Sequence, residues 1–472
     1  MLRTAVTENG TVKGLPADDP RVTVFKGIPF AAPPVGENRW RAPQSASNWD
    51  GVRTCYEFGP ISMQDQPGVG DDIYCREFHV DPDIPISEDC LYLNVWTGAK
   101  STDEKLPVLV WIYGGAFQWG YTSEMEFNGE RLARKGIIVV TIAYRLGAFG
   151  FMAHRQLTKE DPSHPTNFGL LDQQAGLAWV YRNISAFGGD PENITLAGQS
   201  AGGASVSFAL ANSESAKLIK KATVISGMIR NPFYPDEIIQ PRNIPMMEEN
   251  GRAFLEFIGC ATISDARKID AKKLRDLYAE YAKDHPRFVP CIDNEYVKED
   301  PHELYMTGKM PDIPIMTGYT KDEFFEALPA RADTIKSDRD EILADVFEKN
   351  GRKTINLVQN TVRNIAKAHV RRSVSAPMYT YRFAPSIPGY DDPGCFHSCD
   401  LWFFFENVPK CWRPYSGLHY ALSKRMSDYW VNFITTGDPN GTGYDGKNLP
   451  QWNRCTSENV SEDEMIFTEQ GQ

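Results

Sequence analysis

A serine at position 200 lies in the segment Gly198-Gln-Ser200-Ala-Gly202, after the apolar run Ile194 to Ala197 and before a helical pattern. Where a strand is followed by Gly-x-Ser-x-Gly and then by a helix, the serine occupies a sharp turn, and its hydroxyl is exposed above the sheet. Glycines are needed beside it because the turn leaves no room for side chains. The segment therefore predicts that Ser200 is a nucleophile. The alternative is a glycine-rich helix start without chemistry.

A serine hydroxyl is a weak nucleophile alone, so a histidine base and an orienting carboxylate should follow it in the chain. His369 belongs to a basic helical run and is interpreted as a solvated helix residue. His419 is interpreted as a packing residue on a later helix. His397 lies in a loop just before the apolar run Leu401 to Phe405, a placement that suits a base.

Two adjacent carboxylates, Asp322 and Glu323, follow an apolar strand pattern that starts at Ile313. By chemistry alone, either of them can orient the base. The chain order serine, acid, histidine agrees with the order found in α/β hydrolases.

A Gly-Gly pair follows the apolar run Leu106 to Ile112 and can supply backbone donors for a developing negative charge. The N–H groups of Gly115 and Ala116, joined by that of Ala201 after the nucleophile, could converge on one point. Without Ser200 nearby, an ordinary turn would explain the pair equally well.

The elements that position these residues alternate between strand and helix patterns. Besides the strand pattern at Ile313, five segments are expected as strands. They are Thr11 to Lys13 and Val22 to Phe25, which form a small antiparallel edge, and the buried runs Leu106 to Ile112, Gly136 to Ala143 and Ile194 to Ala197. A helix over Leu170 to Ile184 between two of the strands indicates a parallel sheet. Charged helical stretches at Asp265 to Ala282 and Asp338 to Arg372 are expected to cap the site. No linker is evident, so we expect a single domain over residues 1–472.

Composition excludes several classes of function. The chain has 472 residues and a formal charge of −12, with no Lys/Arg stripe, which disfavours nucleic acid or an anionic membrane as partner. The most apolar stretch, Ile137 to Ala153, is interrupted by Arg145 and is too short to span a membrane. The first residues lack an apolar signal region, so we expect a cytoplasmic protein or a secreted one already trimmed. Nine scattered cysteines indicate mostly free thiols.

Cys395, His397 and Cys399 could suggest zinc, because thiolates and imidazole bind it. We reject that interpretation, because alternate residues of an extended chain point to opposite faces. No metal or organic cofactor is therefore expected.

Two longer segments carry a family resemblance. Phe187 to Gly202 and Glu88 to Trp96 match both signatures of the type-B carboxylesterase/lipase family, the carboxylesterase/cholinesterase branch of the α/β hydrolases. The resemblance implies an α/β-hydrolase fold, with a large, mostly parallel central sheet flanked by helices and helical cap excursions. It also implies roles for six residues, with Ser200 as nucleophile, Glu323 as acid, His397 as base, and Gly115, Ala116 and Ala201 as oxyanion donors.

The same resemblance implies scaffold contacts. These are ion pairs of Arg39 with Glu88 and of Asp89 with Arg145, and a disulfide between Cys75 and Cys90. The chain departs from the family where Ala116 and Phe324 replace usual glycines. The aromatic choline-binding segment of cholinesterases has no clear counterpart, which argues against that activity.

We therefore expect a serine hydrolase that cleaves carboxylic esters of small molecules through an acyl-enzyme intermediate. Phe117, Trp119, Phe324 and Trp402 are expected to line the substrate pocket, although Trp402 is equally well explained as a core residue. Such walls suit short-chain or aromatic acyl esters. The alternatives are a feruloyl-type or xenobiotic-ester hydrolase and, in another class, a non-catalytic binding or adhesion module on the same fold.

Overall fold

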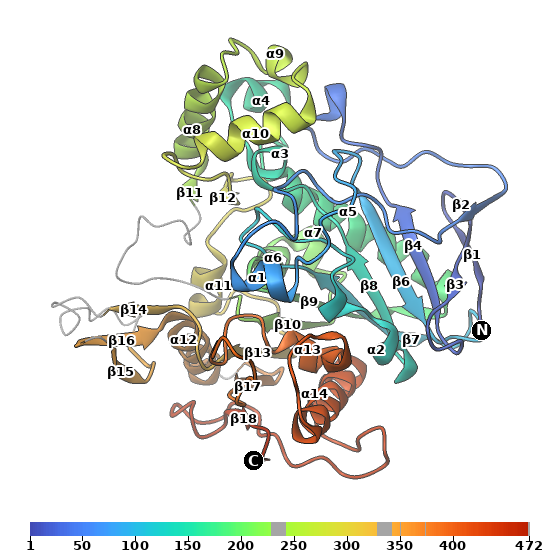
Figure 1. Ribbon diagram of the computed structural model, residues 1–472, viewed down its shortest axis with the longest axis vertical. Coiled ribbons are helices and arrows are strands. Elements are labelled where there is room, and N and C mark those ends of the chain that lie inside the picture. Colours follow the sequence, from blue (N-terminus) through green and yellow to red (C-terminus); the bar gives the residue numbers. More distant parts are fainter. Residues whose placement is uncertain (228–241, 328–341, 350, 373, 471–472) are drawn as a thin grey trace.

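Apolar strands form a large sheet through the middle of the computed structural model, which describes residues 1–227, 242–327, 342–349, 351–372 and 374–470 (Figure 1). Within these residues the sheet has ten strands. From edge to edge they are β18 (Met465–Phe467), β17 (Met378–Phe383), β13 (Ile315–Thr320), β10 (Lys221–Ile225), β9 (Gly189–Gln199), β7 (Leu106–Ile112), β8 (Ile138–Ile142), β6 (Tyr92–Thr97), β4 (Thr23–Pro29) and β3 (Leu15–Pro16).

The sheet is mostly parallel. Every neighbouring pair from β18 to β8 runs parallel, whereas β8 with β6, β6 with β4 and β4 with β3 are antiparallel. The Val- and Ile-rich strands β7 and β8 are almost wholly buried, as expected of strands covered on both faces. The expected large, mostly parallel sheet is therefore confirmed. β7 has the bounds expected from sequence, whereas β9 is longer.

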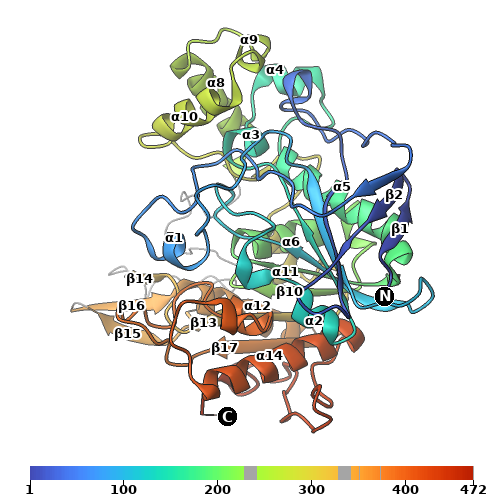
Figure 2. The same ribbon diagram turned by 45° about the vertical axis from the view of Figure 1, so that its right-hand side comes forward.

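Long helices cover both faces of this sheet. α5 (Phe168–Asn183) joins β8 to β9, which run parallel on either side of β7. α6 (Ala201–Ala211) follows β9 directly. Figure 2 shows α5 and α6 on one side of the strands and α14 (Gly417–Thr436) on the other. The indole N–H of Trp430 on α14 donates to Thr223 Oγ1 on β10 at 3.1 Å, which joins this helix to the sheet.

The expected antiparallel edge at the start of the chain divides between two sheets. β2 (Gly10–Lys13) pairs with β1 (Thr4–Thr7) and β5 (Val52–Thr54), whereas β4 belongs to the central sheet. The prediction that the two strands form one edge was therefore wrong, since each strand finds a different partner.

A helical excursion lies at one end of the molecule. It contains α8 (Ile244–Phe257), α9 (Ile263–Arg267) and α10 (Ala271–Tyr281), which stand together at the top of Figure 1. Phe254 packs edge-to-face against Tyr278, Tyr281 and Phe288, with ring centroids 5.1 to 5.9 Å apart. This aromatic cluster gives the excursion its own apolar interior and confirms the helices expected at Asp265 to Ala282.

The second expected excursion is only partly helical. Its first residues, 338–341, lie outside the described residues. Strands β15 (Val346–Lys349) and β16 (Arg352–Asn356) form a small antiparallel sheet with β14 (Phe325–Ala327), and only α12 (Leu357–Arg371) is a helix. Gly351 turns the chain with a φ of +71°. The Asn-Gly pair, a typical hairpin signal, was the feature that sequence analysis overlooked.

The remaining elements are short: α1 (Ile73–Glu77), α2 (Glu130–Arg134), α3 (Gly147–Phe151), α4 (Arg155–Glu160), α7 (Ser213–Ala216), α11 (Pro301–Thr307), α13 (Leu401–Phe404), β11 (Arg242–Asn243) and β12 (Cys291–Ile292). Among the described residues, no helix combines the length and apolar character needed to cross a membrane.

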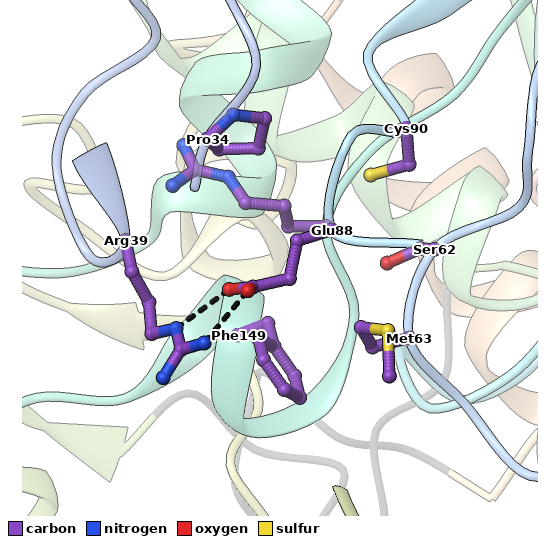
Figure 3. Close-up of a pocket in the computed structure, with 8 residues that line it drawn as sticks. Pro34, Arg39, Ser62, Met63, Glu88, Cys90 and Phe149 are labelled. Atoms are coloured by element: carbon purple, nitrogen blue, oxygen red, sulfur yellow. Dashed lines mark hydrogen bonds and ion pairs between the residues drawn. The ribbon is translucent and has the colours of Figure 1, made fainter. Parts of the chain in front are cut away.

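Buried ion pairs join distant parts of the chain. Arg39 binds Glu88 through two parallel hydrogen bonds of 2.6 Å (Figure 3). The third nitrogen of Arg39 donates to the carbonyl of Ile269 at 2.8 Å. This confirms the first expected pair and ties the excursion to the early loops. The second expected pair was wrong, because Arg145 binds Asp172 on α5, at 2.7 Å, instead of Asp89. Two-point contacts of this kind hold a guanidinium in one geometry.

All nine cysteines are free thiols. The implied disulfide between Cys75 and Cys90 is therefore not formed. Cys90 is fully buried beside the Arg39–Glu88 pair, whereas Cys75 is only partly buried on α1 (Figure 3).

Candidate active site

Ser200 lies on the sharp turn between β9 and α6. Its backbone has φ +56° and ψ −123°, a conformation that non-glycine residues rarely adopt. A Cβ at Gly198 would lie 2.4 Å from the backbone of Gly202, and one at Gly202 would lie 2.0 Å from the carbonyl oxygen of Ile112. Both motif glycines are therefore required by close backbone approach. Ser200 itself is only partly buried, so its hydroxyl can be reached.

His397 and Glu323 meet although they are 74 positions apart. His397 lies between β17 and α13, and Glu323 follows β13. The imidazole Nδ1 is 2.5 Å from Glu323 Oε2. The other carboxylate oxygen accepts the backbone N–H of Thr320 at 2.9 Å and the hydroxyl of Ser226 at 2.5 Å. Three donors thus hold the carboxylate in one orientation.

Asp322 contacts a different segment from Glu323. Its carboxylate accepts the backbone N–H of Cys395 at 2.7 Å, and its own N–H donates to the carbonyl of Cys395 at 2.9 Å. The structure therefore places Glu323 against the imidazole, and Asp322 against the loop that carries the histidine. This geometry favours Glu323 over Asp322 as the carboxylate that orients the imidazole.

The other nitrogen of His397 contacts Gln199. The distance from Gln199 Nε2 to His397 Nε2 is 3.0 Å. Within the described residues, the hydroxyl of Ser200 makes no hydrogen bond. Gln199 and His397 are both buried, so this contact is shielded from water.

The loop after β7 places backbone donors beside Ser200. Gly115, Ala116 and Phe117 all have positive φ, at +100°, +53° and +61°. The N–H groups of Gly115 and Ala116 have no acceptor among the described residues, and that of Ala201 is the first of helix α6. A Cβ at Gly114 would lie 3.0 Å from Ser200 Cβ, so loop and nucleophile are in close approach. These N–H groups can bind an oxyanion.

The excursion holds this loop in place. Gln118 donates to the carbonyl of Phe288 at 2.8 Å and accepts the hydroxyl of Tyr278 on α10 at 2.8 Å. Gly147 N–H donates to the carbonyl of Phe117 at 2.7 Å. The strained backbone of the loop is thus fixed by contacts from three other segments.

The four expected pocket residues occupy different environments. The ring of Phe324 is 43% exposed and lies 4.6 Å from the imidazole of His397, centroid to centroid. Phe117 is buried against Phe151, with ring centroids 5.2 Å apart. Trp119 is partly buried, with the Arg287 guanidinium 4.9 Å above its ring.

Trp402 is fully buried on α13. Its indole N–H donates to Glu77 at 3.1 Å, and its ring lies 5.9 Å from that of Phe78. It therefore packs in the core, which was the alternative explanation from sequence.

Asp400, a fully buried carboxyl, lies in the segment that follows His397. Burial raises its pKa from the ordinary value of 3.8 to about 7, and the nearby negative charge of Glu323 acts in the same direction. Tyr381 donates its hydroxyl to Oδ2 at 2.8 Å, while Oδ1 has no partner among the described residues. With a pKa of about 7, this carboxyl is only about half ionised at neutral pH, which limits the negative charge behind the histidine.

The two thiols beside His397 are directed toward each other. Cys395 Sγ and Cys399 Sγ are 3.7 Å apart, whereas the imidazole faces Glu323. The segment is a turn, and Ser398 has a φ of +78°, so the assumption of an extended chain was wrong. The other two histidines differ in burial. His369 is partly buried on α12, rather than solvated as expected, and His419 packs at the start of α14 as expected.

Sequence analysis missed three residues of this site, Gln199, Ser226 and Asp400. Gln199 lies within the serine motif, and Ser226 follows directly after β10. The carboxyl ends of neighbouring parallel strands meet at one edge of a sheet, so the position of Ser226 was a usable signal. The signal for Asp400 was a carboxyl residue directly between the loop of His397 and the apolar run Leu401 to Phe405.

Comparisons with known proteins extend over nearly the whole chain. The model of the carboxylesterase family matches residues 3–357 and 352–470. The para-nitrobenzyl esterase of Bacillus subtilis is 33% identical over 98% of this chain and 95% of its own length. A bile salt-activated lipase of Bos taurus is 33% identical over 94% of this chain and 80% of its own length.

Solved structures agree with these matches. A carboxylesterase of Geobacillus stearothermophilus superposes with a TM-score of 0.76 at 28% identity, over 99% of this chain and 96% of that one.

Proposed function

The chain belongs to the carboxylesterase family and is a serine hydrolase of carboxylic esters with the α/β-hydrolase fold, and we propose that Ser200, His397 and Glu323 perform its chemistry. The observation that carries this assignment is the 2.5 Å contact between His397 Nδ1 and Glu323 Oε2, next to the strained turn of Ser200. The filled triad also distinguishes the chain from a non-catalytic module on the same fold.

In the proposed mechanism, His397 Nε2 accepts the proton of Ser200 as its oxygen attacks the ester carbonyl. Glu323 keeps the other ring proton on Nδ1 and stabilises the imidazolium that forms. The negative charge on the substrate oxygen is bound by the N–H groups of Gly115, Ala116 and Ala201. The imidazolium then protonates the leaving alkoxide, and water hydrolyses the acyl-enzyme by the same steps.

We propose short-chain or aromatic acyl esters as substrates. The exposed ring of Phe324 beside His397 offers a flat apolar surface close to the reacting carbonyl. Phe117 and Trp119 follow the proposed oxyanion donors in the same loop, and we propose them as further walls of the pocket. One relative is named a para-nitrobenzyl esterase, and nitrobenzyl esters are therefore suitable test substrates here.

The test combines a labelling experiment with a substrate panel. A fluorophosphonate probe should label the wild-type protein and not Ser200→Ala, and the variant should lose hydrolysis of nitrophenyl acetate while its circular dichroism spectrum is unchanged. Wild-type protein without labelling, or a fully active Ser200→Ala protein, would end the assignment. Turnover of long-chain triglycerides only would contradict the proposed acyl preference.

A further inference from the structure

We infer that Gln199 is a positioning residue that binds Nε2 of the neutral catalytic histidine in the free enzyme and opposes its protonation. This inference rests on the proposed function, because it concerns the base of the same triad. Gln199 is next to the nucleophile in sequence, yet its side chain contacts the base, 198 positions away. The role follows from the hydrogen-bonding capacity of the two groups.

The first step concerns the tautomer of His397. A carboxylate can only accept, so the 2.5 Å contact with Glu323 requires the proton to be on the Nδ1 side of the ring. In the neutral imidazole, Nε2 is then an acceptor. The group 3.0 Å from it must donate, and the amide NH₂ of Gln199 does so.

The second step concerns the orientation of the amide. A Cβ at Gly114 would lie 2.8 Å from Gln199 Oε1 and 2.7 Å from the carbonyl oxygen of Gln199. The amide oxygen thus faces Gly114 in the oxyanion loop, and the NH₂ group faces the ring. Glycine at position 114 makes the room that this orientation needs.

Two consequences follow for the reaction. Nε2 must exchange Gln199 for the hydroxyl of Ser200 before it can accept a proton, because the lone pair of Nε2 serves one donor at a time. In addition, the imidazolium carries a proton on Nε2, which would face the two amide hydrogens of Gln199. The amide therefore favours the neutral ring, which is the form that acts as base.

The other groups facing the ring do not replace this contact. Glu323 contacts the opposite nitrogen, and Asp400 acts on the ring through its charge only when ionised. Phe324 covers the ring with an apolar face. The phenol of Tyr74 lies near Glu323, and burial raises its pKa, so it is neutral at working pH. The neighbouring thiols of Cys395 and Cys399 contact each other.

The decisive variant is Gln199→Glu, which keeps the size of the side chain and replaces the donor with a carboxyl group. On the acid side of the profile this carboxyl group and Nε2 hold one additional proton between them, either on the carboxyl group or on the ring. We expect the acid limb of the pH profile of kcat/KM for nitrophenyl acetate to move up by about one pH unit or more. Gln199→Met removes the donor without adding charge, and its acid limb should lie between those of the wild type and Gln199→Glu.

Gln173→Glu is a matched control. Gln173 is equally buried and donates to Ser205 Oγ at 3.0 Å instead of to the histidine. Its acid limb should coincide with that of the wild type. The ¹⁵N resonance of His397 Nε2 gives a second measurement, since it should move toward the position of an unbonded acceptor in Gln199→Met.

Each outcome supports or overturns the inference. A Gln199→Glu protein whose acid limb stays in place, with activity lowered equally at every pH, would show that Gln199 only fills space. An acid limb that moves equally in Gln173→Glu would also overturn the inference. Failure of the proposed function would be seen in a different result, because the wild type itself would then show neither labelling at Ser200 nor turnover of the ester.

Discussion

Replacing Asp400 with asparagine should make the protein more stable at neutral pH and should change how its stability depends on pH. The carboxyl is fully buried, and its pKa is about 7 in the folded protein against an ordinary value of 3.8. Asparagine has nearly the same shape as the protonated acid, and its amide oxygen can still accept the hydroxyl of Tyr381. The variant therefore isolates the contribution of ionisation.

The magnitude follows from the two pKa values. Between pH 3.8 and about 7, the folded state holds a proton that the unfolded state has released. The contribution of this carboxyl to the free energy of unfolding is therefore fully present below pH 3.8 and is lost as the pH rises toward 7. The shift of about 3 units corresponds to about 4 kcal/mol, at about 1.4 kcal/mol per unit. Structural relaxation around the ionised carboxylate makes this an upper value.

The assay is urea unfolding of the wild type and Asp400→Asn at several values between pH 5 and pH 8.5. The free energy of unfolding of the variant minus that of the wild type should increase by about 1 kcal/mol per pH unit up to about pH 7 and then level off. Asp50→Asn, at an exposed position, should show a difference that does not change with pH. A difference for Asp400→Asn that is equally independent of pH would refute the reasoning.

Two further predictions concern the machinery of the site. Glu323→Gln should lower kcat about 10³-fold or more, because it removes the charge that stabilises the imidazolium. Asp322→Asn should lower kcat only mildly. If steady-state kinetics gave the reverse ranking, Asp322 would be the carboxylate that stabilises the imidazolium. Gly202→Ala should destabilise the protein by about 3 kcal/mol or more, because the new methyl would lie 2.0 Å from the carbonyl oxygen of Ile112. At Gly417 no atom lies within 4 Å of an added Cβ, so Gly417→Ala should be neutral or stabilising by about 0.5 kcal/mol in thermal unfolding. Equal effects of Gly202→Ala and Gly417→Ala would contradict the steric argument.

The sequence predicted the sheet well where its pattern was local. The run Leu106 to Ile112 has the expected bounds because a buried parallel strand appears as an uninterrupted apolar segment. Residues 346–356 were predicted poorly, because their charged residues were assigned to a helix and the Asn350-Gly351 hairpin signal was overlooked. The pairing of β16 with β14, which places the hairpin beside Phe325, could not be predicted from this stretch alone.

In the candidate site, too, local features could be predicted from the sequence and long-range contacts could not. The serine turn could be predicted from five residues because the Gly-x-Ser-x-Gly pattern is local, although the contact that requires Gly202 is with Ile112 on β7. Ser226 and Asp400 could not be assigned in this way, because each of them acts on a residue of another strand or loop. The partner of Arg145 that the family resemblance implied, Asp89, was also wrong, because the guanidinium pairs with Asp172 on α5.

By itself, the sequence determined the alternation of strands and helices from β7 to β9, the Gly-x-Ser-x-Gly turn, and the two neighbouring carboxylates from which an acid could come. Only the tertiary structure decided that Glu323 meets the imidazole, that Asp322 holds the loop, and that Gln199 occupies Nε2. Local patterns report steric limits and burial along a short stretch of chain. Contacts across 74 or 198 positions depend on how whole elements pack, which no short stretch contains.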